Sequence, residues 1–121
     1  MFTIAVETHF SASHQITMAD GTREPPHRHD WIVTAEVSSE RLNEMGLVMD
    51  FICLKKSIQR IVAPFQNAAL ETLECFHRAN SSAENVAKYI YEQLLPLIPG
   101  GVKLEFVSVV EEPLCRAKFC R

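Results

Sequence analysis

The sequence predicts an α+β domain in which two pairs of antiparallel strands flank two helices, in the order ββααββ. Two segments near the N-terminus alternate apolar and polar residues with a period of two, and two shorter segments of this kind end the chain. Between them lie two stretches whose apolar residues recur at helical spacing. The chain has 121 residues and no repeat or linker, so we expect a single domain over residues 1–121.

The first two expected strands span residues 2–14 and 27–37, joined by a loop over residues 18–26 that contains Asp-Gly and Pro-Pro. In the first strand the apolar residues occupy alternate positions, and His14 is the last residue on that face. In the second strand His27 and His29 share the parity of the apolar positions that follow them. If the two strands pair as a hairpin, the three histidines lie close together.

Two helices are expected next. Asp50 is the predicted N-cap of the first helix, and Pro64 ends it. Ser81 with Glu84 forms a capping-box pattern that begins the second helix, and Pro99 with the following glycines ends it. The buried stripe predicted for this helix consists of Val86, Ile90, Leu94 and Leu97. Residues 65–80, between the helices, predict no definite element.

The chain ends with two further strands. Val102, Leu104 and Phe106 share one parity and begin the third strand, and residues 115–120 form the fourth after a turn at Glu112-Pro113. Two short helices cannot cover both faces of a four-stranded sheet, and the sheet edges stay unpaired. We therefore expect a homo-oligomer.

Composition excludes several classes of protein. The formal net charge is −3 with no basic patch, so a nucleic-acid partner is not expected. No apolar run approaches the roughly 20 residues of a membrane span, and the N-terminus lacks the basic start and cleavage pattern of a signal peptide. A cytoplasmic protein is expected. Four cysteines occur without a CxxC pair, which favours free thiols over a cysteine zinc site.

The histidines predict a metal site. His27 and His29 leave the same face of a strand, about 7 Å apart at a rise of ~3.4 Å per residue. Together with His14 they can offer three imidazoles to one Zn²⁺ and leave a fourth position open, as in catalytic or ligand-binding sites. The competing interpretation is a polar strand end with three ordinary surface histidines. His9 and His77 are interpreted as surface histidines.

Several motifs, in order along nearly the whole chain, resemble the 6-pyruvoyl tetrahydropterin synthase and 6-carboxytetrahydropterin synthase family. Residues 10–14 are similar to its FxAxH, and residues 27–29 lie where it has HGH. Residues 49–55 resemble its (V/M)xDFxxLK. Residues 82–87 are similar to its TSENLA. Residues 110–113, together with Ala117 and Phe119, are similar to the family's C-terminal VxET…AxY motif.

This resemblance implies a tunnelling fold, in which small subunits pair their sheets into a barrel, commonly as a hexamer of two trimers. It implies zinc on His14, His27 and His29. It also implies a pterin ligand whose guanidine-like edge binds the Glu111 carboxylate, with Ser82 and Glu84 in the same substrate site. The substrate of the family is dihydroneopterin triphosphate, and a cysteine and an Asp-His pair transfer its protons.

The sequence departs from the family in its proton-transfer residues. No cysteine precedes Cys53, so the family's cysteine before the HxH motif is missing. Glu24, three residues before His27, is the nearest candidate for a general base and resembles the glutamate of family members that cleave the whole side chain. The simpler interpretation of Glu24 is an ordinary loop acid.

Two further positions differ. The family's Asp-His pair falls on Gln66 and Asn67, which cannot exchange protons near neutral pH. Arg28 replaces the glycine of HGH and is expected to point away from the metal, toward a neighbouring subunit or an anionic substrate tail. Three functions remain open: a zinc lyase with a rearranged base, a pterin-binding protein without turnover, and a zinc site used on another substrate.

Overall fold

The computed structural model describes residues 1–121 and contains the predicted order of elements. Strands β1 (Phe2–His14) and β2 (His27–Ser39) are followed by helices α1 (Phe51–Val62) and α2 (Ala83–Leu94), and then by β3 (Lys103–Glu112) and β4 (Cys115–Phe119). The strands form one antiparallel sheet in the order β1-β2-β3-β4. The predicted α+β class is therefore confirmed.

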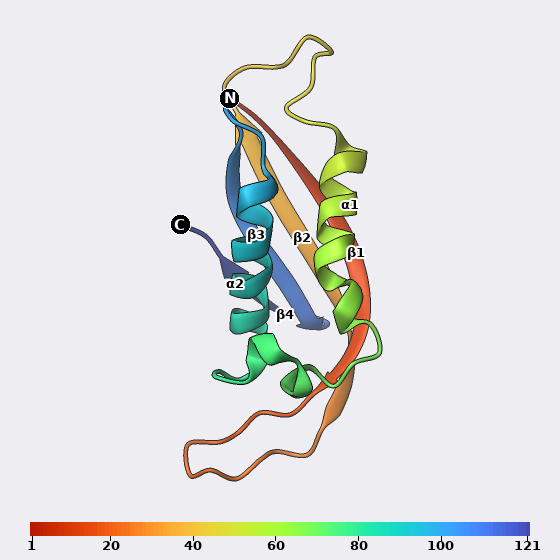
Figure 1. Cartoon of the computed structure of the whole chain (residues 1–121), viewed down its shortest axis with the longest axis vertical. Coiled ribbons are helices and arrows are strands. Elements are labelled where there is room, and N and C mark those ends of the chain that lie inside the picture. Colours follow the sequence, from red (N-terminus) through yellow and green to blue (C-terminus); the bar gives the residue numbers. More distant parts are fainter.

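Both helices pack on one face of the sheet, and the other face carries no helix (Figure 1). Helix α1 lies over β1, and α2 lies over β3 and β4. The core between the layers contains 23 buried residues, among them Trp31, Phe65, Leu54 and Ile58. No helix has the length and apolar character needed to cross a bilayer.

Strands β1 and β2 pair as the expected hairpin. His14 is paired with His27, and Ala12 with His29, so the alternation of both strands sends these histidines toward the helix side of the sheet. Phe10 lies opposite Trp31, and their rings stack at a centroid distance of 5.5 Å. This pair closes the core directly beneath the histidines.

Strand β3 contains two β-bulges. Because of the first one, the prediction that Leu104 and Phe106 share one face of the sheet is wrong. Leu104 pairs with Val37 but Phe106 pairs with Glu36, so Glu105 is an extra residue. Leu104 is buried, whereas Phe106 points to the opposite face and lies against Lys118. The core positions beyond the bulge are Val107 and Val109. A second irregularity between Val110 and Glu112 leaves Glu111 outside the regular pairing.

The helix boundaries differ from the prediction at α2. Asp50 caps α1 as expected, since its carboxylate accepts the backbone N–H of Ile52 at 2.7 Å. The N-cap of α2 is Ser82, whose Oγ accepts the N–H of Asn85 at 3.2 Å, so the predicted capping box at Ser81 is shifted by one residue. The prediction of a buried Leu97 is also wrong, because α2 ends at Leu94 and Leu97 is 49% exposed.

Residues 63–76 form three short 3-10 segments, η1 (Ala63–Phe65), η2 (Leu70–Thr72) and η3 (Glu74–Phe76). Another, η4 (Leu95–Leu97), follows α2. Between η1 and η2 the chain runs along the free edge of β1, where Ser13 forms a parallel bridge with Ala69. The segment left undefined by the sequence therefore protects the edge next to the histidines.

Candidate functional site

The side chains of His14, His27 and His29, here called the histidine cluster, converge at the end of the β1–β2 hairpin. Their ring centroids lie 4.5 to 5.5 Å apart, and one nitrogen from each ring lies within 4.8 Å of the other two. The strand register causes this convergence, because it places His14 across from His27 while the alternation returns His29 to the same face.

His14 is the buried member of the cluster, with 1% of its surface exposed. Its Nδ1 donates to the backbone carbonyl of Ser81 at 2.7 Å, which fixes the tautomer and leaves a lone pair on Nε2. That Nε2 atom is buried and has no hydrogen-bond partner. A buried nitrogen without a partner is costly unless a cation or a donor reaches it.

Glu111 reaches the same nitrogen from β3. Its Oε1 lies 2.7 Å from His14 Nε2, although outside hydrogen-bond geometry. The second bulge of β3 explains this position, because the residue that leaves the regular pairing is free to turn toward the helix side. A cation bound at this nitrogen would therefore also lie close to a negatively charged group.

Glu24 binds the outer nitrogen of His27. Its Oε1 lies 2.9 Å from His27 Nε2 and also accepts the backbone N–H of Ile16 at 3.2 Å. The hydrogen bond from His27, with a smaller contribution from Ile16, lowers the pKa of Glu24. Because His27 donates its Nε2–H to Glu24, its other ring nitrogen, Nδ1, faces the inside of the cluster. This Nδ1 lies 2.5 Å from His29 Nε2.

These donor atoms fit a zinc ion. Each of the buried or half-buried rings turns one nitrogen inward, and two of them have their other nitrogen held by a carbonyl or a carboxylate. Such partners are typical of metal-bound histidines, because they fix the ring and raise its basicity. Three imidazoles leave a fourth position for a water or a substrate oxygen, and Glu111 lies beside it.

The other predicted substrate-binding residues lie next to Glu111. Glu84, exposed in the first turn of α2, and Glu111 line one cavity of about 440 Å³, together with Arg116 and Lys118 of β4. Ser82 caps α2 and directly follows Ser81, the residue that holds His14. The structure therefore places Glu24 and Glu111 against the histidine cluster and Glu84 in one cavity with Glu111, whereas Ser82 is connected to the cluster only through its neighbour Ser81.

The amides that replace the family's Asp-His pair have structural partners. Gln66 accepts the backbone N–H of Ser11 at 3.1 Å, and the N–H of Asn67 donates to the Ser11 carbonyl at 2.6 Å. The Asn67 side chain accepts from Arg28 at 2.5 Å. Arg28 therefore points away from the metal as predicted, and it binds its own chain at Asn67.

Neither Cys75 nor Cys115 has the lowered pKa of an activated thiol. All four cysteines are free and exposed. Burial is the main cause that raises the pKa of Cys75, and it also raises that of Cys115, where the neighbouring Glu112 carboxylate adds to the effect. A raised pKa keeps a thiol protonated near neutral pH, so neither side chain is suited to accept a proton.

Two features of the site were missed in the sequence. The Ser81 carbonyl orients His14, but a backbone group carries no signature in the amino-acid sequence. The contact between Glu24 and His27 was also missed. Their spacing of three residues is the only sequence signal for this contact.

Comparison with known proteins agrees with this geometry. The family described as 6-pyruvoyl tetrahydropterin synthase matches residues 3–121. The chain belongs to this family. Its fold is accordingly the tunnelling fold: the structure of the Caenorhabditis elegans 6-pyruvoyl tetrahydropterin synthase superposes with a TM-score of 0.85 at 22% identity. That alignment covers 99% of this chain and 95% of the nematode chain.

Two proteins named for reactions on pterins are similar in sequence. The dihydroneopterin monophosphate aldolase of Pyrococcus furiosus is 30% identical over 102 residues, which cover 84% of this chain and 82% of the relative. The putative 6-carboxy-5,6,7,8-tetrahydropterin synthase of Archaeoglobus fulgidus is 33% identical over 111 residues, covering 89% and 86%. The two relatives are named for different reactions on pterins.

Proposed function

We propose that this chain is a zinc-dependent pterin lyase-family protein, which holds one zinc ion on the histidine cluster and binds a dihydroneopterin phosphate. The observation that carries the proposal is the buried Nε2 of His14, which has no hydrogen-bond partner and faces the Glu111 carboxylate. A zinc ion bound there satisfies this nitrogen together with the inward nitrogens of His27 and His29.

Zinc supplies a Lewis acid that polarises a hydroxyl or carbonyl oxygen of the substrate side chain. The carboxylates of Glu111 and Glu84 line one cavity and suit the N–H donors along the guanidine-like edge of a pterin. The Ser82 hydroxyl, which already accepts from the helix, keeps its own O–H as a donor for the ligand.

A specific observation favours side-chain cleavage over synthesis of the 6-pyruvoyl product. The chain lacks the cysteine and the Asp-His pair, but it places a carboxylate, Glu24, against one of the three histidines. The Pyrococcus furiosus relative is named an aldolase. Aldolases are enzymes that cleave a carbon–carbon bond, which in this case would lie in the side chain of the pterin. Binding of a pterin without turnover is the remaining alternative.

The metal assignment is tested by elemental analysis of protein purified without added metal. About one zinc per chain is expected, and the double variant His27→Ala/His29→Ala should lose it. His9→Ala is the matched control, because His9 is exposed on the other face of β1. Undiminished zinc in the double variant would contradict the assignment.

The reaction is tested with the zinc-loaded protein and dihydroneopterin phosphates, followed by mass spectrometry. Loss of the side-chain carbons supports the cleavage reaction, and a 6-pyruvoyl or 6-carboxy product supports the synthase reaction. Binding without a mass change identifies a pterin-binding protein. If no pterin binds to zinc-loaded protein, the proposed ligand class is wrong.

We further propose that the protein is a cytoplasmic homohexamer.

A further inference from the structure

The strand end that carries two of the proposed zinc ligands has a neighbouring strand on one side only. Strand β2 pairs with β1 from His27 onwards, but it pairs with β3 only from Ile32 onwards. The end of the β1–β2 hairpin therefore extends past β3, as Figure 1 shows. His27 and His29 lie on this extension, so their positions depend on contacts from outside the regular sheet.

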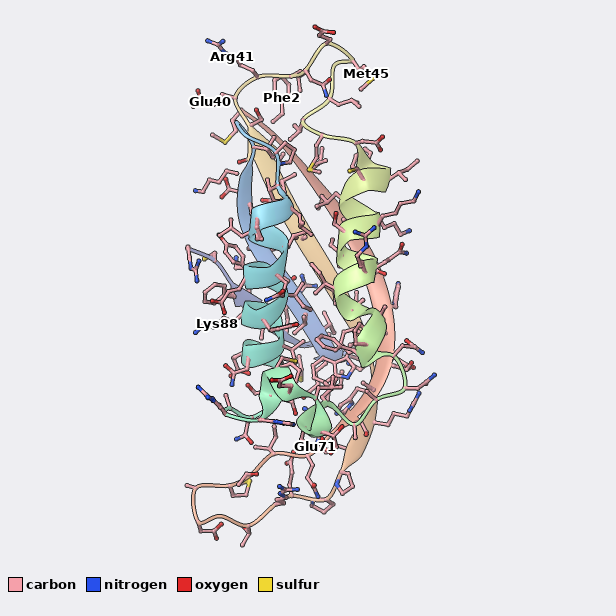
Figure 2. The ribbon with its side chains drawn as sticks, viewed as in Figure 1. Phe2, Glu40, Arg41, Met45, Glu71 and Lys88 are labelled. Atoms are coloured by element: carbon pink, nitrogen blue, oxygen red, sulfur yellow. The ribbon has the colours of Figure 1, made fainter.

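The segment of residues 66–69 contacts the extension along the free edge of β1. The N–H of Asn67 donates to the Ser11 carbonyl at 2.6 Å, and Oε1 of Gln66 accepts the Ser11 N–H at 3.1 Å. Glu71, which follows this segment on η2, lies in Figure 2 at the end of the molecule that carries the β1–β2 loop. The segment therefore replaces a neighbouring strand for β1 at the level of the histidine cluster.

Arg28 connects this segment to β2. The residue lies between His27 and His29, and strand alternation sends its side chain to the face of the sheet without helices. From there its Nη2 donates to Asn67 Oδ1 at 2.5 Å. Because Asn67 lies beyond the far edge of β1, the Arg28 side chain crosses over β1 to reach it. The contact thereby joins β2, β1 and the 66–69 segment at the strand end that carries the histidines.

The backbone of Asn67 has an unusual conformation. Its φ of 60° lies in the left-handed region, which asparagine tolerates better than most residues with a side chain. In this conformation the residue makes both contacts at once, with its N–H on Ser11 and its side-chain oxygen on Arg28. A glycine adopts the same backbone conformation without strain but offers no acceptor to Arg28.

We propose that Arg28 is a positioning residue for the zinc site, which acts through Asn67 to hold the extended end of β2. His27 and His29 then keep their inward nitrogens close to that of His14 before a metal binds. The proposal rests on the proposed function, because it concerns the affinity of the histidine cluster for zinc. Groups that orient a metal ligand typically change metal affinity by about 10–100-fold.

The direction of the effect tests the proposal. Arg28→Ala removes a positive charge near a bound dication, which by itself should strengthen zinc binding, whereas loss of the positioning contact should weaken it. We expect a zinc dissociation constant raised by roughly tenfold, measured by competition with a chelator. Arg23→Ala is the matched control, since Arg23 is exposed and its side chain donates no hydrogen bond; it should bind zinc at least as tightly as wild type. Unchanged or tighter binding by Arg28→Ala would overturn the proposal.

Variants of the two partners show whether they act as one unit. Asn67→Gly should weaken zinc binding about as much as Arg28→Ala. The double variant Arg28→Ala/Asn67→Gly should be no weaker than either single variant, because all three lose the same contact. Arg28→Lys keeps a donor at this position and should restore most of the affinity. Losses that add in the double variant would contradict the proposed contact.

A spectroscopic measurement separates positioning from a general effect on folding. The visible absorption of Co²⁺ bound in place of zinc depends on its coordination geometry. Arg28→Ala should change this spectrum, while urea unfolding of the zinc-free protein stays near wild type because Arg28 is exposed. An unchanged spectrum with a destabilised zinc-free protein would overturn the positioning role. A wild type that binds no zinc would refute the proposed function itself, whereas equal zinc affinity in wild type and Arg28→Ala would refute only this proposal.

Discussion

At the scale of single residues, the site depends on how each histidine is oriented. His14 is held by the Ser81 carbonyl and His27 by the Glu24 carboxylate, and in both rings the free nitrogen points inward. The two contacts differ in chemistry. A carbonyl only orients the ring, whereas a carboxylate can also accept a proton, which gives Glu24 two distinguishable roles.

Glu24→Gln and Glu24→Ala separate these roles. An amide oxygen still accepts from His27 Nε2–H, so Glu24→Gln should keep its zinc but lose turnover by roughly 10²–10⁴-fold if Glu24 is the general base. Glu24→Ala should also bind zinc more weakly, because a partner of a metal ligand is lost. Zinc content and turnover are measured for both variants. Equal turnover in wild type and Glu24→Gln would exclude the catalytic role.

The missing proton-transfer residues lead to a related expectation. Conversion of dihydroneopterin triphosphate to a 6-pyruvoyl or 6-carboxy product should be poor or absent. Family-level rates of these reactions in the wild type would contradict it. His77 offers no clear substitute, because its Nε2 lies 3.1 Å from the Thr72 carbonyl and the side chain is exposed.

Glu111 and Glu112 provide the second test at this scale. Adjacent strand residues point to opposite faces, and the structure turns Glu111 toward His14 while Glu112 is exposed. Glu111→Gln should weaken the binding of a reduced pterin by roughly tenfold, and Glu112→Gln should not, since only the first loses a charge-assisted hydrogen bond. Fluorescence titration measures both. Loss of binding in the Glu112 variant alone would show that the other acid is the anchor.

At the scale of elements, the start of α2 joins the fold to the site. Ser82 caps the helix, and the preceding carbonyl of Ser81 holds His14. The Ser81 hydroxyl itself is buried and makes no hydrogen bond. A shift of one residue in the cap would therefore remove the carbonyl from the histidine cluster.

Alanine substitutions at the two serines test the boundary of α2. Ser82→Ala should lower the free energy of unfolding by about 1 kcal/mol, the usual cost of losing an N-cap. Ser81→Ala removes a hydroxyl without a hydrogen-bond partner and should cost less. Urea unfolding of the zinc-free proteins measures both. A larger loss at Ser81 would indicate that Ser81, not Ser82, caps the helix.

At the scale of the whole molecule, the sheet has one uncovered face and two outer strands. Ile32, Val110 and Phe106 lie on the face without helices and are half-buried. Strand β4 has a free edge, and β1 is covered by residues 66–69 only near the histidines. Free edges and apolar sheet faces favour association.

From these surfaces we predict a homo-oligomer, and the family resemblance favours a hexamer of two trimers. Light scattering at micromolar concentration should give a mass of about six times the 13.7 kDa of one chain. Ile32→Lys should reduce that mass while the monomer keeps its far-UV circular dichroism, because the change adds a charge only to the uncovered face. A monomeric wild type at this concentration would contradict the prediction.

The sequence by itself determined the order of the elements and the face that carries the histidines. Both depend on local periodicity, and a strand alternates its side chains whatever it pairs with. The position of Glu111, the face of Phe106 and the cap of α2 were decided by tertiary structure. A bulge exists only relative to a partner strand, and it reverses the parity of every later residue.

The contact between the β1–β2 loop and the segment before α2 was also beyond the reach of the sequence. Thr17 and Asn80 are 63 positions apart in two segments that show no periodicity. The Asn80 side chain accepts from and donates to the backbone of Thr17, and a contact between an amide and a backbone group leaves no pattern in the sequence. Local periodicity thus placed the metal ligands, while long-range hydrogen bonds decided what surrounds them.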